Sequence, residues 1–347
     1  MMDDLPLLEV VDLSVTFSSR EGEVFAVDKV SFSLFPNEVL GVVGESGSGK
    51  SVTSLSILRV LPASSRIANG SIFFRDEGRT IELANVDSES EPVRSVRGRR
   101  ISMIFQEPMS AFSPLHTIGN QIGEAIALHN LPPGLSRSQR KLEVRKQTID
   151  LLASVGMPTP EQLIDSYPHE LSGGMRQRAL IAMGLACHPS ILIADEPTTA
   201  LDVTLQSQVI ALLSRLRSEQ EMSIIFITHN LGVIAEIADR VLVMYLGREM
   251  ETASVDDLFH NPKHPYTRAL IRSMPTIAGT LDTLIPIEGT VPSPNNLPTG
   301  CRFQTRCPER VDGLCNVHEP ISIEIEPGHR VACFLSGSPV PQGGTND

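Results

Sequence analysis

The segment Gly44-Glu45-Ser46-Gly47-Ser48-Gly49-Lys50-Ser51 follows an apolar run at 39–43 and precedes a helical pattern at 50–61. It fits the pattern G-x-x-x-x-G-K-[ST], whose glycines let the backbone wrap closely around phosphate groups. Loop amides and the positive end of the following helix match the phosphate charge. We expect Lys50 to contact the β- and γ-phosphates of a nucleotide and the Ser51 hydroxyl to bind Mg²⁺. The full set of expected nucleotide contacts in this loop is Gly44, Ser46, Gly47, Ser48, Gly49, Lys50, Ser51 and Val52.

Around this loop, short near-continuous apolar runs alternate with helical patterns. The runs at 39–43, 101–105, 191–194, 224–227 and 241–244 suit strands that are buried on both faces. The helical patterns lie at 50–61, 138–155, 174–186 and 205–221. The chain is therefore predicted to be α/β, with a P-loop (RecA-like) core.

Two further regions depart from this alternation. Segments 7–17 and 26–35 are rich in β-branched residues and predict an antiparallel β subdomain. The stretch from about 107 to 186 has helical periodicity and little strand signal, which predicts an inserted helical subdomain.

Two carboxylates, Asp195 and Glu196, follow the apolar run at 191–194. In isolation, two acids at a strand end are often only a solvated turn. In a chain with a phosphate-binding loop, Asp195 can hold Mg²⁺ through water and Glu196 can act as a general base on the attacking water. We expect both to belong to the nucleotide site.

A second anion site is predicted at 171–178, which reads Leu-Ser-Gly-Gly-Met-Arg-Gln-Arg. Ser172 is a good N-cap residue. Because Gly173 and Gly174 have no side chains, the backbone amides at the start of the helix stay accessible to an anion. The segment resembles the LSGGQ signature of ABC ATPases, with Met175 where Gln is commonest. This resemblance implies that the signature of one subunit covers ATP held by the phosphate-binding loop of another, so that the working unit is a dimer.

Other motifs of that family follow in family order. Gln106 matches the Q-loop glutamine, which senses Mg²⁺ and the attacking water; 200–202, Ala-Leu-Asp, matches the D-loop; and His229 matches the histidine that contacts the γ-phosphate. The resemblance implies an ATPase with Glu196, His229 and Gln106 as catalytic residues, Gln106 and Ser51 also being Mg²⁺ ligands. An aromatic ring from the first strands should stack on adenine. Phe17 is favoured over Phe25, although either could be a core residue.

Proline and glycine become frequent after 250, which predicts a separate C-terminal module at 251–347 after a nucleotide-binding domain at 1–250. Its segment 259–267, containing His264-Pro265-Tyr266, resembles the tail of the oligopeptide, dipeptide and nickel branch of ABC importers. The resemblance implies a peptide importer with a second ATPase subunit, commonly a paralogue, two transmembrane permease subunits and an extracytoplasmic peptide-binding protein. Nickel or another small solute is the alternative cargo. His260 and His264 are expected to pack rather than to bind a metal.

Four cysteines in this module, Cys301, Cys307, Cys315 and Cys333, have the spacing C-x5-C-x7-C-x17-C. A reducing compartment disfavours disulfides, which leaves Zn²⁺, a [4Fe-4S] cluster or unliganded thiols. The absence of a tight C-x2-C pair departs from common zinc-ribbon spacing. Some members of the resembled importer branch carry a [4Fe-4S] cluster here, so a structural cluster is favoured.

Composition limits the remaining choices. The net charge is -12 and the basic residues are scattered apart from a short run at 94–100, so no nucleic-acid partner is expected. No apolar run approaches the roughly 20 residues needed to cross a bilayer, and the acidic start lacks a secretory signal. We therefore expect a peripheral protein at the cytoplasmic face of the cell inner membrane. A soluble, non-transport ABC ATPase is the alternative, but neither a second cassette nor a long coiled-coil insertion is evident.

Overall fold

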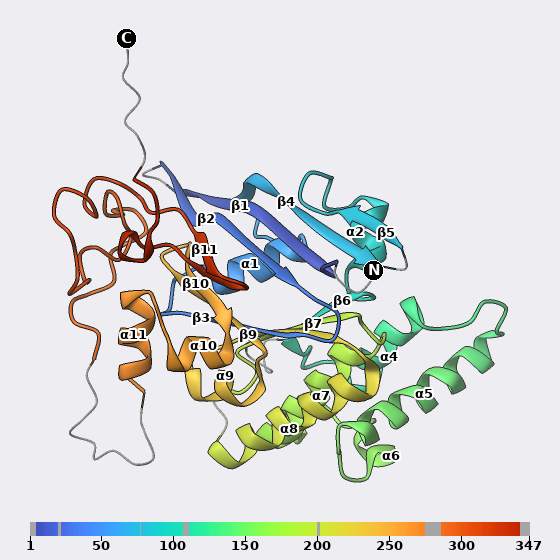
Figure 1. Ribbon diagram of the computed structural model, residues 1–347. Helices are drawn as coiled ribbons and strands as arrows, with labels where there is room; N and C mark the ends of the chain where they lie inside the picture. Colours follow the sequence, from blue (N-terminus) through green and yellow to red (C-terminus); the bar gives the residue numbers. More distant parts are fainter. Residues whose placement is uncertain are drawn as a thin grey trace. The chain divides into compact units, whose positions relative to one another are not determined.

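The computed structural model describes residues 5–19, 22–76, 78–106, 111–199, 202–274 and 286–340 (Figure 1). The chain divides into two compact units. The first comprises 1–34, 39–85 and 228–347, and the second comprises 35–38 and 86–227.

The first unit contains a four-stranded antiparallel sheet with the order β2-β1-β4-β5. Its strands are β1 (Leu8–Ser19), β2 (Gly22–Leu34), β4 (Ser65–Asp76) and β5 (Arg79–Glu82). The predicted antiparallel pair is confirmed, since Leu8 pairs with Leu34 and Phe17 with Val24. Sequence reasoning missed β4, because only Ile72 and Phe74 of its side chains are fully buried and the apolar signal is weak.

A second sheet of the first unit carries the phosphate-binding loop. Its strand β3 (Val39–Val43) is buried along its whole length and runs parallel to β9 (Arg240–Tyr245), as the apolar runs predicted. Beyond β9 the sheet continues antiparallel through β10 (Arg248–Ser254), β12 (His329–Val331) and β11 (Ile323–Glu326). Residues near the end of the chain therefore extend the sheet that contains β3.

Among its described residues, this first unit contains the helices α1 (Lys50–Ile57), α9 (Leu231–Ile237), α10 (Val255–His260) and α11 (Pro265–Arg272). Helix α9 packs closely on β3, because a Cβ at Gly41 would lie only 2.8 Å from the Ile234 side chain. Close packing of this kind keeps β3 rigid behind the loop that follows it. From 286 to 340 the chain is mostly irregular, with β11, β12 and a 3₁₀ turn at Phe334–Ser336 as its regular elements.

The second unit is built on three parallel strands, β6 (Ile101–Ile104), β7 (Ile191–Asp195) and β8 (Ser223–Ile227). All three are buried, which explains their continuous apolar sequences. Helix α7 (Gly173–Leu185) packs against them, since a Cβ at Gly184 would lie 3.2 Å from Ile104 and 3.3 Å from Leu192. The unit's other described helices are α2 (Glu91–Val96), α4 (Ile118–His129), α5 (Arg137–Ser154), α6 (Pro160–Leu163), a 3₁₀ turn at Pro168–Glu170 and α8 (Val203–Gln220).

The α/β class with parallel central strands is thus confirmed. Across the described ranges, no helix combines the length and the apolar character needed to span a bilayer.

Candidate nucleotide site

The loop at 44–51 turns tightly between β3 and α1. The Ser48 amide donates to the Glu45 carbonyl at 3.2 Å, and Gly49 caps α1 with a φ of 97°. The Lys50 ammonium folds back over the loop, donating to the carbonyl oxygens of Gly44 at 2.7 Å and Glu45 at 3.1 Å. The loop therefore keeps a positive charge close to its own backbone, where it can attract a phosphate group.

Glycines decide which side of this loop is closed. A Cβ at Gly44 would lie 2.1 Å from the Met244 carbonyl oxygen, and one at Gly49 would lie 2.5 Å from that of Ala26. At Gly47 the φ is 78°, yet a Cβ would meet nothing within 4 Å. One side of the loop is thus pressed against β9 and β2, while the other side is open to a ligand.

His229 and the candidate aromatic residues belong to the same unit as the loop. The Thr228 amide donates to the Val42 carbonyl oxygen at 3.2 Å, which places His229 beside the end of β3, where the loop begins. The His229 side chain is exposed. Phe17 is half-buried on β1 and Phe25 is exposed on β2, so the choice of adenine-stacking ring stays a prediction.

In the second unit, the structure brings two predicted catalytic residues into contact. Gln106 follows β6 and donates from Nε2 to Oε2 of Glu196 at 3.2 Å, across 90 positions of sequence. The same oxygen accepts from the Thr199 hydroxyl at 2.7 Å. Asp195, at the end of β7, is buried, and Glu196 turns away from the strand with a φ of 48°. These contacts orient one carboxylate at the end of a rigid strand, which suits a general base.

The start of α7 is capped and accessible. Ser172 Oγ accepts from the Met175 amide at 3.3 Å, which confirms its capping role. A Cβ at Gly173 would meet nothing within 4 Å, whereas one at Gly174 would lie 3.2 Å from Leu205. The helix start is therefore open at Gly173, as an anion-binding terminus requires. In the D-loop segment, Asp202 caps α8 through the Leu205 amide at 2.9 Å, while Ala200 and Leu201 lie outside the described residues.

Comparisons with known proteins agree with this arrangement. A family model described as "ABC transporter" matches residues 27–199, and one described as "Oligopeptide/dipeptide transporter, C-terminal region" matches 250–315. The oligopeptide transport ATP-binding protein AppD of Bacillus subtilis (strain 168) is 47% identical over 95% of this chain and 96% of its own. The dipeptide transport ATP-binding protein DppD of the same organism is 43% identical over 95% of this chain and 94% of its own length.

The chain belongs to the ABC transporter ATP-binding family. Its fold is also similar to that of a solved structure, the ATP-binding cassette MJ0796 bound to ADP and Pi. The TM-score is 0.61, and the match has 23% sequence identity and covers 72% of this chain and 98% of that chain. The ABC ATPase family membership predicted from 171–178 and the other motifs is therefore confirmed.

The four C-terminal cysteines of this ABC ATPase line one cavity together with His264 and Phe303. Burial raises the pKa of the Cys301 thiol to about 12, and it also raises those of Cys307 and Cys333. All five cysteines of the chain are free. Among the described residues, however, no three His, Cys, Asp or Glu side chains lie close enough to hold a metal ion, so the expected metal cluster has no direct support.

The two histidines of 259–267 have different environments. His260 is exposed and paired with Asp256. His264 is buried and caps α11, its Nδ1 accepting from the Tyr266 amide at 3.0 Å. Burial lowers the pKa of His264 to about 3, which keeps the ring neutral and able to accept that bond.

Sequence reasoning missed the role of Tyr266 in this segment. Its hydroxyl accepts from the Glu45 amide of the phosphate-binding loop at 3.0 Å. The segment's distinctive composition was a usable signal, but nothing in its spacing points to residue 45.

Proposed function

We propose that this chain is the ATP-hydrolysing subunit of an ABC importer that drives peptide uptake across the cell inner membrane, from its cytoplasmic face. The match of 250–315 to the oligopeptide/dipeptide transporter region carries this proposal. It is supported by near full-length relatives named as oligopeptide and dipeptide transport proteins. These names favour the importer over a soluble, non-transport ATPase.

In the proposed site, Lys50 and the loop amides bind the phosphates of ATP, and Phe17 stacks on adenine. Ser51 and Gln106 would hold Mg²⁺, with Asp195 contributing through water, and the ion would neutralise charge that develops on the phosphates. Glu196 accepts a proton from the attacking water, and Gln106 helps to orient this carboxylate. His229 and the Ser172–Gly174 helix start of a neighbouring subunit stabilise charge on the γ-phosphate.

The proposed partners follow from the same branch of the family. They are a second ATPase subunit that is commonly a paralogue, two transmembrane permease subunits and an extracytoplasmic peptide-binding protein, with no nucleic acid. We propose a nucleotide-binding domain at 1–250, with a helical subdomain at about 107–186, and a C-terminal module at 251–347. The proposed boundary falls within β10, whose partner β12 comes from the module.

Reconstitution in vesicles with the permease subunits tests the transport role. We expect ATP-dependent uptake of labelled di- or oligopeptides when the peptide-binding protein is present, and none with Lys50→Ala, which removes the loop ammonium. Labelled nickel serves as the competing cargo. Uptake of nickel alone, or ATP hydrolysis that never couples to uptake, would refute the peptide proposal.

We further propose that Cys301, Cys307, Cys315 and Cys333 hold a structural [4Fe-4S] cluster. Soft thiols converging on one apolar cavity are the donor set that such a cluster uses. A single Zn²⁺ ion bound by the same four thiolates is the alternative occupant.

Metal analysis of anaerobically purified protein tests the cluster. We expect iron and acid-labile sulfide in equal amounts, and their loss together with a lower thermal midpoint in Cys307→Ser. The matched control is Cys187→Ser, because this buried thiol lies in the second unit. Stoichiometric zinc, or no metal, would exclude the cluster.

A further inference from the structure

Glu45, the second residue of the phosphate-binding loop, is held by two side chains from the C-terminal part of the chain. Its carboxylate accepts two bonds from the Arg306 guanidinium, at 2.6 Å from Nη1 and 3.1 Å from Nη2. Its amide donates to the Tyr266 hydroxyl at 3.0 Å. Its carbonyl oxygen accepts from Lys50 at 3.1 Å. Every polar group of Glu45 is thus fixed, two of the three by residues more than 200 positions away.

Arg306 is itself firmly placed. Its side chain is only 4% exposed, and its guanidinium also donates to the Tyr245 hydroxyl at 3.3 Å and lies 5.8 Å from the centre of that ring. Nε donates to the Glu288 carbonyl oxygen at 3.0 Å. Because the guanidinium group of Arg306 is planar and held by several hydrogen bonds, it fixes the Glu45 carboxylate in one orientation.

Tyr266 is equally well placed. It is fully buried, with its ring centre 4.7 Å from that of Tyr245 and 5.1 Å from that of Phe303. The preceding turn is fixed by the buried Glu251 carboxylate, which accepts from the amides of Lys263 at 2.7 Å and His264 at 3.0 Å. The His264-Pro265-Tyr266 segment therefore presents one hydroxyl rigidly to the loop.

We propose that Arg306 and Tyr266 are positioning residues through which the C-terminal module holds the phosphate-binding loop ready for ATP. A glycine-rich loop loses much conformational entropy when it is ordered, and two external anchors reduce that loss at the moment of binding. Arg306 also neutralises the Glu45 carboxylate, which would otherwise repel the phosphates from within their own loop. This inference rests on the proposed nucleotide site and adds the residues that shape it.

Steady-state ATPase kinetics of the assembled transporter test the proposal. Arg306→Met keeps the length and apolar contacts of the side chain but removes the bidentate pair, so we expect the KM for ATP to rise roughly 10- to 100-fold with a smaller change in kcat. Tyr266→Phe removes one neutral hydrogen bond and should raise KM only about 2- to 10-fold. Arg306→Lys should partly restore the affinity.

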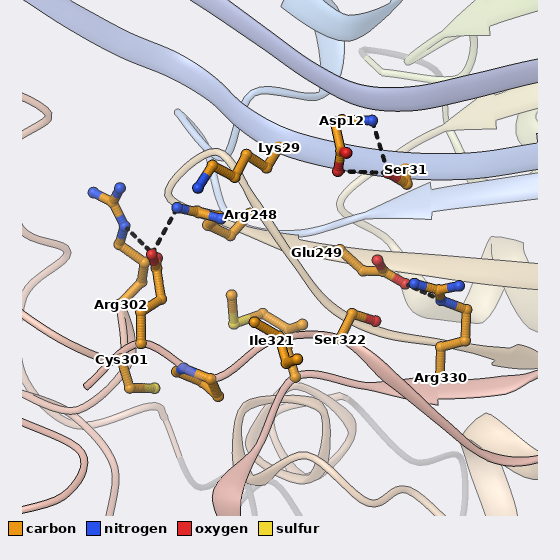
Figure 2. Close-up of a pocket in the computed structure, with 14 residues that line it drawn as sticks. Asp12, Lys29, Ser31, Arg248, Glu249, Cys301, Arg302, Ile321, Ser322 and Arg330 are labelled. Atoms are coloured by element: carbon orange, nitrogen blue, oxygen red, sulfur yellow. Dashed lines mark hydrogen bonds and ion pairs between the residues drawn. The ribbon is translucent and has the colours of Figure 1, made fainter. Parts of the chain in front are cut away.

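A double variant separates positioning from general stability. In Glu45→Gln/Arg306→Met no unpaired carboxylate remains in the loop, so the KM should fall back toward that of Glu45→Gln alone. The matched control is Arg302→Met. Like Arg306, Arg302 is adjacent in sequence to a cysteine of the cavity, and its side chain is 11% exposed, but it pairs with Asp28 and Glu319 instead of the loop. Figure 2 shows Arg302 beside Arg248 in a pocket that both residues line together with Glu319. Both arginines pair with the Glu319 carboxylate.

The possible outcomes are distinct. An unchanged KM in folded Arg306→Met, or an equal rise in Arg302→Met, would overturn the positioning role while leaving the ATPase proposal intact. Failure of the unaltered transporter to hydrolyse ATP would instead remove the proposed function itself.

Discussion

Replacing Glu196 with glutamine is expected to lower ATP turnover by roughly 10²- to 10⁴-fold while ATP binding is retained. Glutamine has the same shape, and its amide oxygen can still accept from Gln106 and Thr199, so the local structure should persist. It cannot take a proton from the attacking water at neutral pH. Single-turnover hydrolysis, measured together with equilibrium binding of ATP, separates these two effects.

The matched control for this change is Glu219→Gln. Glu219 is an exposed glutamate on α8 that pairs with Arg215, and its replacement should leave turnover within about twofold of normal. Near-normal hydrolysis in Glu196→Gln would exclude this carboxylate as the base. Loss of ATP binding in that variant would indicate instead that Glu196 acts on the structure of the site.

Replacing Gly173 with aspartate should reduce ATP hydrolysis about 10³-fold without unfolding the chain. A Cβ at this position meets no atom within 4 Å, and an acidic residue in the first turn of α7 favours the helix. If the helix start faces the phosphates of ATP held by a neighbouring subunit, two like charges about 4 Å apart repel by about 4 kcal/mol at an effective dielectric constant of about 20. Turnover and the thermal midpoint are the two measurements.

Gly173→Asn is the control of equal size, and it should lose far less activity because it adds no charge. Equal losses in the two variants would attribute the effect to size and not to anion binding. Full activity in Gly173→Asp, with the fold preserved, would show that this helix start never meets a nucleotide.

Local sequence patterns were sufficient to predict a feature where that feature depends on residues close together in the sequence. Strand β3 was predicted at its observed limits because its residues are continuously apolar and buried on both faces. The capping role of Ser172 was likewise readable, because an N-cap acts on an amide three positions away. Strand β4 was missed for the converse reason, since most of its side chains are not buried and leave no periodic signal.

By itself, the sequence determined the family, the glycine-rich loop at 44–51, the order of the family motifs and the presence of a cysteine-bearing C-terminal region, because each depends on contiguous residues. Only the tertiary structure decided which distant residues meet. Arg306 holds Glu45 across 261 positions, and Gln106 contacts Glu196 across 90. Such pairs depend on strand order and on packing within a sheet, and no local periodicity encodes either one.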